Sequence, residues 1–231
     1  KVLDTAMHNI TATLHARGLW NSTLMLMMSD NGGIGPGNNY PLRGQKSTPW
    51  QGGTRVAAYA TGGFVPAGAR GAKLRSTLQF ADVYSTLCNV AGVVADDTPT
   101  IRGSPRPIDG KNFWPLILNT SLNGSTDAHA ELHEYLPTTE SSIIWRGRWK
   151  LITDATAGGW FPAGGRGPNN TMLTPDPNEW PCVNASEPVA GCHVCDMAKP
   201  CLFDLTNDEA ERVNLALQHP NLVKQLQAQP V

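Results

Sequence analysis

The sequence predicts an α/β protein with a smaller α+β subdomain at its C-terminal end. Two features of the first half indicate an α/β fold: residues 3–17 have the spacing of an amphipathic helix, and the run 23–28 is apolar at successive positions. A strand that is apolar on both faces is typical of a parallel sheet covered by helices. Residues 142–153 alternate between apolar and polar side chains instead, which is typical of antiparallel strands.

Apolar residues at helical spacing define the first helix, and Gly18 marks its end; the spaced residues are Leu3, Met7, Ile10 and Leu14. The strand over 23–28 ends abruptly in the polar, glycine-rich turn 29–33. In open α/β sheets, ligands bind at this end of the strands. The turn is therefore a candidate site.

The later elements are shorter. They are predicted as a strand over 55–60, a helix over 78–91, a short helix over 113–118, a hairpin pair over 142–153, a strand near 202–205 and a helix over 220–228. The Asn- and Ser-rich stretch 119–127 separates two predicted domains, residues 1–118 and residues 119–231. A buried parallel strand needs neighbours on both sides. We therefore expect most of the sheet, and the N-terminal half of the protein, to precede this chain.

The composition is that of a globular protein, with 40% hydrophobic and 16% charged residues and a net charge of −1. No basic run or acidic tail points to nucleic acid or to a membrane surface. The longest apolar run, Leu24 to Met28, is too short to span a bilayer.

Glycosylation sequons and cysteines indicate the secretory pathway, either the lysosome or the cell exterior. The six sequons exceed the roughly two expected by chance and begin at Asn9, Asn21, Asn119, Asn123, Asn169 and Asn184. In an oxidising compartment, four clustered cysteines predict two disulfides with three possible connectivities: Cys182, Cys192, Cys195 and Cys201. A zinc site at Cys192 and Cys195 is the alternative, because their spacing is CxxC. Cys88 lies on an apolar helical stripe and is predicted to be a buried thiol.

Three residues of the loop after the strand are suited to binding a metal ion and an anion. Asp30 and Asn31 offer carboxylate and amide oxygens, the ligands that Ca²⁺ prefers. An ordinary Asp-Asn-Gly turn is the alternative. Lys46 lies in a loop that burial of hydrophobic side chains does not explain. A point positive charge near a metal helps to bind an oxyanion. A solvated surface lysine is the alternative.

Six segments of the chain together closely resemble the sulfatase family, and most of all the C-terminal half of the arylsulfatase B type. They are Ser29 to Gly33, Asn38 to Lys46, Trp50 to Arg55, Gln79 to Leu87, Arg146 to Leu151 and Leu202 to Leu205. The resemblance weakens over residues 93–107 and 155–200. It implies an alkaline-phosphatase-like fold and hydrolysis of sulfate esters on sugar or aryl substrates.

The resemblance also implies roles for four residues. Asp30 and Asn31 would ligate calcium, and Lys46 would contact the sulfate group and act in catalysis. His133, in the segment Glu131 to Glu134, would line the substrate pocket, although a structural histidine is as good an explanation. The family usually has Glu where this chain has Gln51, so a negative charge is lost in the loop behind the site.

One essential part of a sulfatase is not found in this chain. The family's nucleophile is a formylglycine made from the Cys of a Cys-x-Pro-x-Arg motif, and none of the five cysteines has that context. We therefore expect this chain to carry half a site and to be inactive alone. Three alternatives stay open: a phosphatase or phosphodiesterase of the same superfamily, a non-catalytic binder of sulfated glycans, and a structural glycoprotein module.

Overall fold

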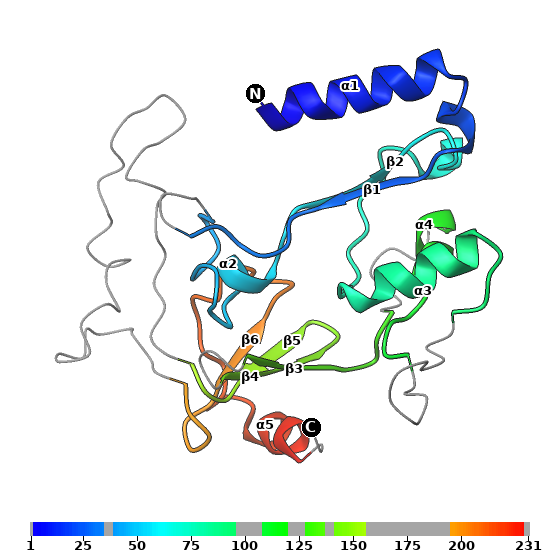
Figure 1. Ribbon diagram of the computed structural model, residues 1–231. Helices are drawn as coiled ribbons and strands as arrows, with labels where there is room; N and C mark the ends of the chain where they lie inside the picture. Colours follow the sequence, from blue (N-terminus) through cyan, green and yellow to red (C-terminus); the bar gives the residue numbers. More distant parts are fainter. Residues whose placement is uncertain are drawn as a thin grey trace, which may run out of the picture. The chain divides into compact units, whose positions relative to one another are not determined.

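The computed structural model describes residues 2–34, 39–95, 108–119, 128–136, 141–155 and 195–228. The chain divides into two compact units, and each is described separately. The first comprises residues 1–27 and 58–130, and the second comprises residues 28–57 and 131–231 (Figure 1). The second unit thus combines the loop of the candidate site with the C-terminal strands, whereas the sequence suggested a division after residue 118.

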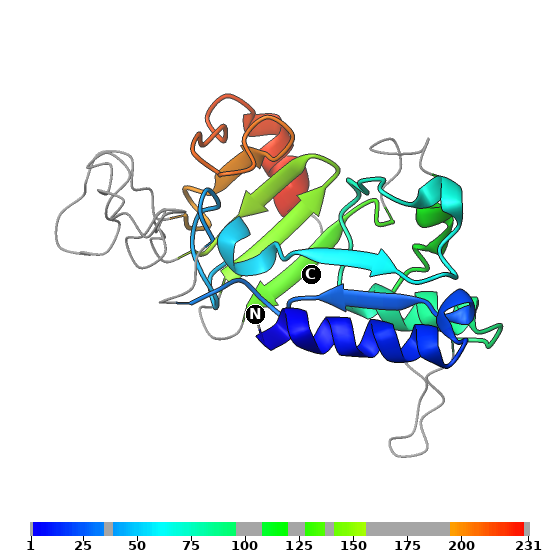
Figure 2. The ribbon, with the colours of Figure 1, turned by 90° about the horizontal axis from the view of Figure 1, so that it is seen from above.

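The first unit contains helices and a two-stranded sheet. Its elements are α1 (Val2–Ala16), η1 (Trp20–Ser22), β1 (Met25–Met28), β2 (Ala58–Thr61), η2 (Ala67–Ala69), α3 (Ala81–Val90) and α4 (Trp114–Leu118). β1 pairs with β2, and the two strands run in opposite directions (Figure 2). The predicted helices and strands of this half are confirmed, to within a few residues at their ends.

The strand β1 is half-buried at all four residues within the described part of the chain. We expected a strand of a parallel sheet whose other strands precede this chain, whereas the neighbour that the described residues supply, β2, is antiparallel. The physical reason for the half-burial is that β2 is the paired neighbour of β1 in the two-stranded sheet, so its other edge and much of its faces are not covered by the described residues. No residue of α1 is buried either.

A buried hydrogen-bonded pair fixes α3 in the first unit. The Asp82 side chain is fully buried, and its Oδ1 lies 2.7 Å from Nε2 of His129. The same carboxylate accepts backbone N–H groups from Gln79 at 2.8 Å and from Lys111 at 2.7 Å. Because the partners come from three segments, this carboxylate connects the start of α3 to the chain before α4 and before β3.

The second unit is built on a four-stranded antiparallel sheet in the order β3-β4-β5-β6. Its elements are α2 (Gln51–Thr54), β3 (Leu132–Leu136), β4 (Ser141–Arg146), β5 (Trp149–Ile152), β6 (Cys201–Asp204) and α5 (Pro220–Gln227). β4 and β5 form the predicted hairpin, and Gly147 takes the left-handed conformation at its turn, with φ of 54°. β3 and α2 were not predicted.

The two faces of this sheet pack against different parts of the unit. On one face, Ile144, Leu151 and Leu202 share a core with Val223 and Leu226 of α5. On the other face, the core combines side chains of all four strands with the loop before α2; its buried members include Ile143, Trp145, Ile152, Phe203 and Trp50. The loop of the candidate site is therefore anchored on the sheet face opposite to α5.

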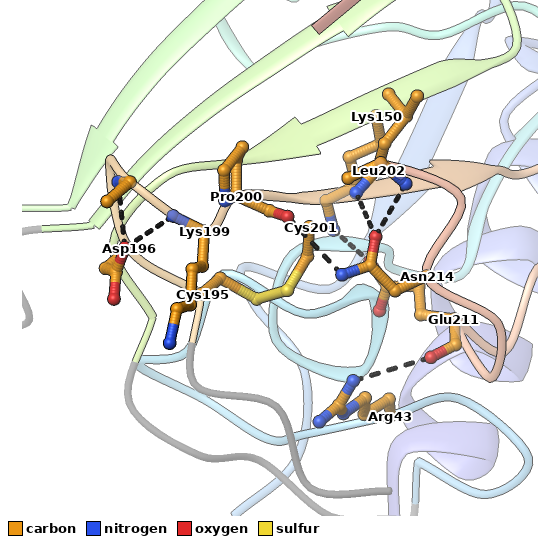
Figure 3. The surroundings of a disulfide bond; sticks show 12 residues. Arg43, Lys150, Cys195, Asp196, Lys199, Pro200, Cys201, Leu202, Glu211 and Asn214 are labelled. Carbon is orange, nitrogen blue, oxygen red and sulfur yellow. Dashed lines mark hydrogen bonds and ion pairs between the residues drawn. A yellow bond between two sulfur atoms is a disulfide. The ribbon is translucent and has the colours of Figure 1, made fainter. Parts of the chain in front are cut away.

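A disulfide joins Cys195 to Cys201 beside this second core. Figure 3 shows its surroundings, where the Asn214 amide accepts the Leu202 N–H at 3.0 Å and donates to the Pro200 carbonyl at 3.3 Å. One of the predicted disulfide pairings is thereby present, and it removes Cys195 as a zinc ligand. Cys182 and Cys192 lie outside the described residues, and Cys88 is a half-buried free thiol on α3.

Candidate metal and anion site

The turn after β1 presents two oxygen-bearing side chains. Asp30 is exposed and Asn31 is half-buried. Oδ1 of Asp30 accepts the N–H of Asn31 at 2.9 Å, and Nδ2 of Asn31 donates to the carbonyl of Gly32 at 2.9 Å. Within the described residues, these bonds leave the second carboxylate oxygen and the amide oxygen without a partner. Both are hard donors, so the turn fits part of a calcium shell.

The loop that carries Lys46 is hydrogen-bonded to this turn. The Lys46 N–H donates to the carbonyl of Gly33 at 3.1 Å, and the Lys46 side chain is exposed. The Asn39 amide accepts the Gly33 N–H at 2.7 Å and donates to the Gly33 carbonyl at 2.8 Å. The structure therefore brings the backbone of Lys46 together with the turn that holds Asp30 and Asn31.

The turn packs closely against the backbone of α2. The Gly32 N–H donates to the Gly53 carbonyl at 2.9 Å. A Cβ atom placed on Gly32 would lie 1.7 Å from the carbonyl oxygen of Gly52, so no other residue fits there without moving backbone. Glycine is required because two stretches of main chain touch.

A buried ion pair is hydrogen-bonded to the first residue of α2. Nζ of Lys150 lies 2.7 Å from Oε1 of Glu211, and both side chains are fully buried. Oε2 of Glu211 accepts the N–H of Gln51, the first residue of α2, at 2.6 Å. Burial of two charges is tolerated when each is paired and hydrogen-bonded, as here.

Arg43 completes this buried group. Its guanidinium lies 3.6 Å from the centre of the Trp50 ring and donates to the main-chain carbonyl of Glu211 at 3.5 Å (Figure 3). Burial lowers the pKa of Arg43 to about 10, against the opposing attraction of Glu211 and Asp208. Burial also raises the pKa of Glu211 and lowers that of Lys150, while their mutual attraction opposes both shifts.

Sequence reasoning did not find this buried group, although a signal for part of it was present. Lys150 stands in a strand between apolar residues, at a position whose neighbours on the same face, Ile152 and Phe203, are buried. A charged residue at such a position is rarely fully buried unless it is paired. The identity of the partner, 61 residues away along the chain, had no local signal.

His133 lies apart from the turn and from Lys46. It stands opposite Ile144 on β4, and therefore on the sheet face that packs against α5. Its Nε2 lies 2.7 Å from Oε1 of Glu131, whose other oxygen binds Arg146. The Nδ1 atom of His133 is buried and lacks a hydrogen-bond partner among the described residues. A substrate-binding role for His133 stays a prediction.

The Glu131 carboxylate is the centre of this second cluster. Burial alone would raise its pKa, but hydrogen bonds and charges from His133 and Arg146 outweigh burial and lower the pKa below its usual value. The cluster connects the start of β3 to the end of β4. In the described part of the chain, no group of three or more His, Cys, Asp or Glu side chains is arranged to hold a metal ion.

Comparison with known proteins identifies the relatives of this chain. No protein-family model matches it. It is 29% identical over 239 residues to arylsulfatase J of Mus musculus, a match that covers 97% of this chain and 37% of that protein. It is also 29% identical over 227 residues to steryl-sulfatase of Rattus norvegicus, with 91% and 34% covered. The chain resembles the sulfatase family. It spans about a third of the length of these curated relatives and matches their C-terminal part.

Solved structures of sulfatases show the same fold. Ps i-CgsB superimposes with a TM-score of 0.63 at 19% identity, over 96% of this chain and 39% of that one. PsFucS1 sulfatase from Pseudoalteromonas sp. gives a TM-score of 0.61 at 17% identity, over 97% and 39%. Ps i-CgsB has also been solved in complex with k-i-k-neocarrahexaose. The predicted fold class, a C-terminal part of the alkaline-phosphatase-like sulfatase fold, is confirmed.

The described part of the chain has no helix that is both long and apolar enough to span a membrane. Three of the six sequon asparagines are described residues: Asn9 on α1, Asn21 on η1, and Asn119 directly after α4. All three are exposed, as a glycosylated asparagine must be.

Proposed function

We propose that the protein to which this chain belongs is a calcium-dependent sulfuric ester hydrolase of the arylsulfatase type, acting on sulfated sugars or aryl sulfates. The observation that carries this proposal is the shared loop network in which the turn of Asp30 and Asn31 is bonded to the backbone of Lys46. The similarity to sulfatases supports hydrolysis of sulfate esters in general. Calcium, an arylsulfatase B type of specificity and the residue roles are our proposals.

In this proposal each residue of the network has one task. Asp30 and Asn31 supply oxygen ligands from a backbone that glycines hold in place. Lys46 directs a positive charge to the sulfate oxygens, so that the negative charge of the reacting group is offset as it moves to the leaving oxygen. Calcium and an upstream formylglycine, when present, would supply further charge compensation and the nucleophile.

The chain supplies only part of such a site. Calcium takes about 6–8 oxygen ligands, and Asp30 and Asn31 give at most about three. We propose that the remaining ligands and the nucleophile come from the N-terminal half of the same protein, and that the chain alone is inactive. We also propose that the protein is an N-glycosylated enzyme of the lysosome or the cell exterior, because of the six sequons.

The alternatives differ in what they require. A non-catalytic binder of sulfated glycans would keep Lys46 and lack a Cys-x-Pro-x-Arg motif. A phosphatase or phosphodiesterase of the superfamily would use two transition metals with several histidine ligands. Asp30 and Asn31 beside Lys46 suit one hard cation better.

The deciding experiment uses the full-length protein on a chromogenic aryl sulfate, with and without a calcium chelator. Turnover that the chelator abolishes, and that needs an upstream Cys-x-Pro-x-Arg cysteine, is the expected result. Turnover of an aryl phosphate but not of the sulfate would favour the phosphatase. Binding of sulfated oligosaccharides without any turnover, in a protein that lacks the motif, would favour the glycan binder.

A further inference from the structure

We propose that Glu211 is a positioning residue for the candidate site: through Gln51 and α2, its carboxylate fixes the backbone of the turn that carries Asp30 and Asn31. The catalytic consequence of this inference rests on the function proposed above. The positioning itself rests on contacts within the second unit and can be tested separately.

Each oxygen of the Glu211 carboxylate has its own partner. Oε2 accepts the N–H of Gln51 at 2.6 Å, and Oε1 lies 2.7 Å from Nζ of Lys150. Glu211 and Lys150 are both fully buried, so water does not compete for these bonds. Because Lys150 belongs to β5, the carboxylate connects the start of α2 to an inner strand of the sheet.

α2 passes this restraint to the turn through main-chain contact. The carbonyl of Gly53 accepts the N–H of Gly32 at 2.9 Å. Gly32 has no room for a Cβ atom against the carbonyl of Gly52. No flexible side chain lies between the two backbones, so a displacement of α2 moves Gly32 and with it the neighbouring Asn31.

A second path runs from the main chain of Glu211 to the loop of Lys46. Arg43 donates to the Glu211 carbonyl at 3.5 Å, and its own carbonyl accepts the N–H of Gly52 at 2.6 Å. Lys46 follows three residues after Arg43 in the same loop. Glu211 is therefore linked through Gln51 to the turn of Asp30 and Asn31, and through Arg43 to the loop of Lys46. It touches neither Asp30, Asn31 nor Lys46 itself.

The backbone conformation of Glu211 supports this role. Within the described residues, the left-handed region holds two residues other than glycine: Glu211, with φ of 57°, and Ser47, with φ of 66°. Non-glycine residues in that region are strained and persist where their surroundings fix them, often at functional sites. Glu211 carries the carboxylate, and Ser47 directly follows Lys46.

The test compares two double variants of the full-length protein that both remove the buried ion pair. Lys150→Met with Glu211→Gln keeps an oxygen that can accept the Gln51 N–H, whereas Lys150→Met with Glu211→Leu has no acceptor. Replacing a buried ion pair with uncharged residues of similar volume is often tolerated. A third variant, Lys150→Met with Glu211→Asn, shortens the side chain so that its oxygen is withdrawn from Gln51, while Asn accepts the left-handed backbone.

We expect the Gln variant to stay within about three-fold of the wild-type kcat, and the Leu and Asn variants to lose about 10- to 100-fold, as a misplaced catalytic geometry does. Hydrogen exchange over residues 29–34 and 39–54 should quicken in the Leu and Asn variants and stay at the wild-type rate in the Gln variant. Equal exchange and equal kcat in all three variants would overturn the inference. If the wild type shows no sulfatase turnover, the proposed function fails, and the exchange comparison still decides whether Glu211 positions the turn.

Discussion

The Nε2 atom of His129 lies 2.7 Å from the Oδ1 atom of Asp82, and the two side chains are almost wholly buried. Asp82 also accepts two backbone N–H groups, so its removal leaves several buried donors without an acceptor. We expect Asp82→Ala to lower the free energy of unfolding by about 3 kcal/mol or more. Asp4→Ala, at an exposed position on α1, is the control and should change it by less than about 0.5 kcal/mol. Chemical denaturation measures both, and equal effects would show that the pair does not stabilise the fold.

Lys46→Ala in the full-length protein should lower turnover of a sulfate ester by about 10²-fold or more, because the positive charge proposed to bind the sulfate group is lost. Since the Lys46 side chain is exposed, the melting temperature should hardly change. Lys224→Ala on α5 removes another exposed lysine and serves as the matched control. Unchanged steady-state kinetics for Lys46→Ala would remove this residue from the site.

Acid sensitivity should depend on Glu131. Its pKa in the folded protein is lowered below the usual value, so the stability it contributes is present at neutral pH and is lost as the pH falls through the lowered pKa. We expect Glu131→Gln to reduce the free energy of unfolding by about 1–2 kcal/mol at pH 7 and by progressively less below about pH 4. Denaturant titrations at several pH values measure this difference.

The control for Glu131 is Glu209→Gln. Glu209 pairs with Arg55 at 2.8 Å, but both side chains are about half exposed. Exposed ion pairs contribute little to stability, so this variant should follow the wild type at every pH. A Glu131→Gln difference that stays constant down to pH 3 would contradict the assignment.

The core beneath α5 should be sensitive to loss of side-chain volume. Leu226 is fully buried against the sheet, whereas Leu217, nine residues earlier, is 96% exposed. Leu226→Ala should cost about 2–5 kcal/mol through lost burial and the resulting cavity, and Leu217→Ala should be close to neutral. Thermal unfolding of the two variants provides the comparison, and similar melting temperatures would show that α5 does not contribute to the core.

Most helices and strands could be predicted because their signals are local. The spacing of Leu3, Met7, Ile10 and Leu14 predicted α1, and alternation around Gly147 predicted the β4–β5 hairpin. α2 had no such signal, since two of its four residues are glycines, which disfavour helix. It forms where Glu211, 160 residues later, accepts its first N–H.

The residues of the candidate site were proposed from local signals of the same kind. Asp30, Asn31 and Lys46 lie in one short stretch whose glycines and polar residues stand out in the sequence. The support of that stretch was not predictable, because Lys150 and Glu211 come from distant segments and become neighbours only through the sheet. Likewise, β3 is an edge strand of mixed polar and apolar residues, without a clear alternation to mark it.

The exposed apolar residues of α1 should affect how this chain, taken by itself, behaves in concentrated solution. Leu3 and Ile10 are 63% and 49% exposed, and the net charge of −1 gives little repulsion between molecules. Salts such as ammonium sulfate strengthen apolar association, whereas they screen attraction between charges. Light scattering by this chain should therefore rise with ammonium sulfate, and Leu3→Gln with Ile10→Gln should delay that rise. The concentration at which the chain remains monodisperse should therefore fall as ammonium sulfate is added.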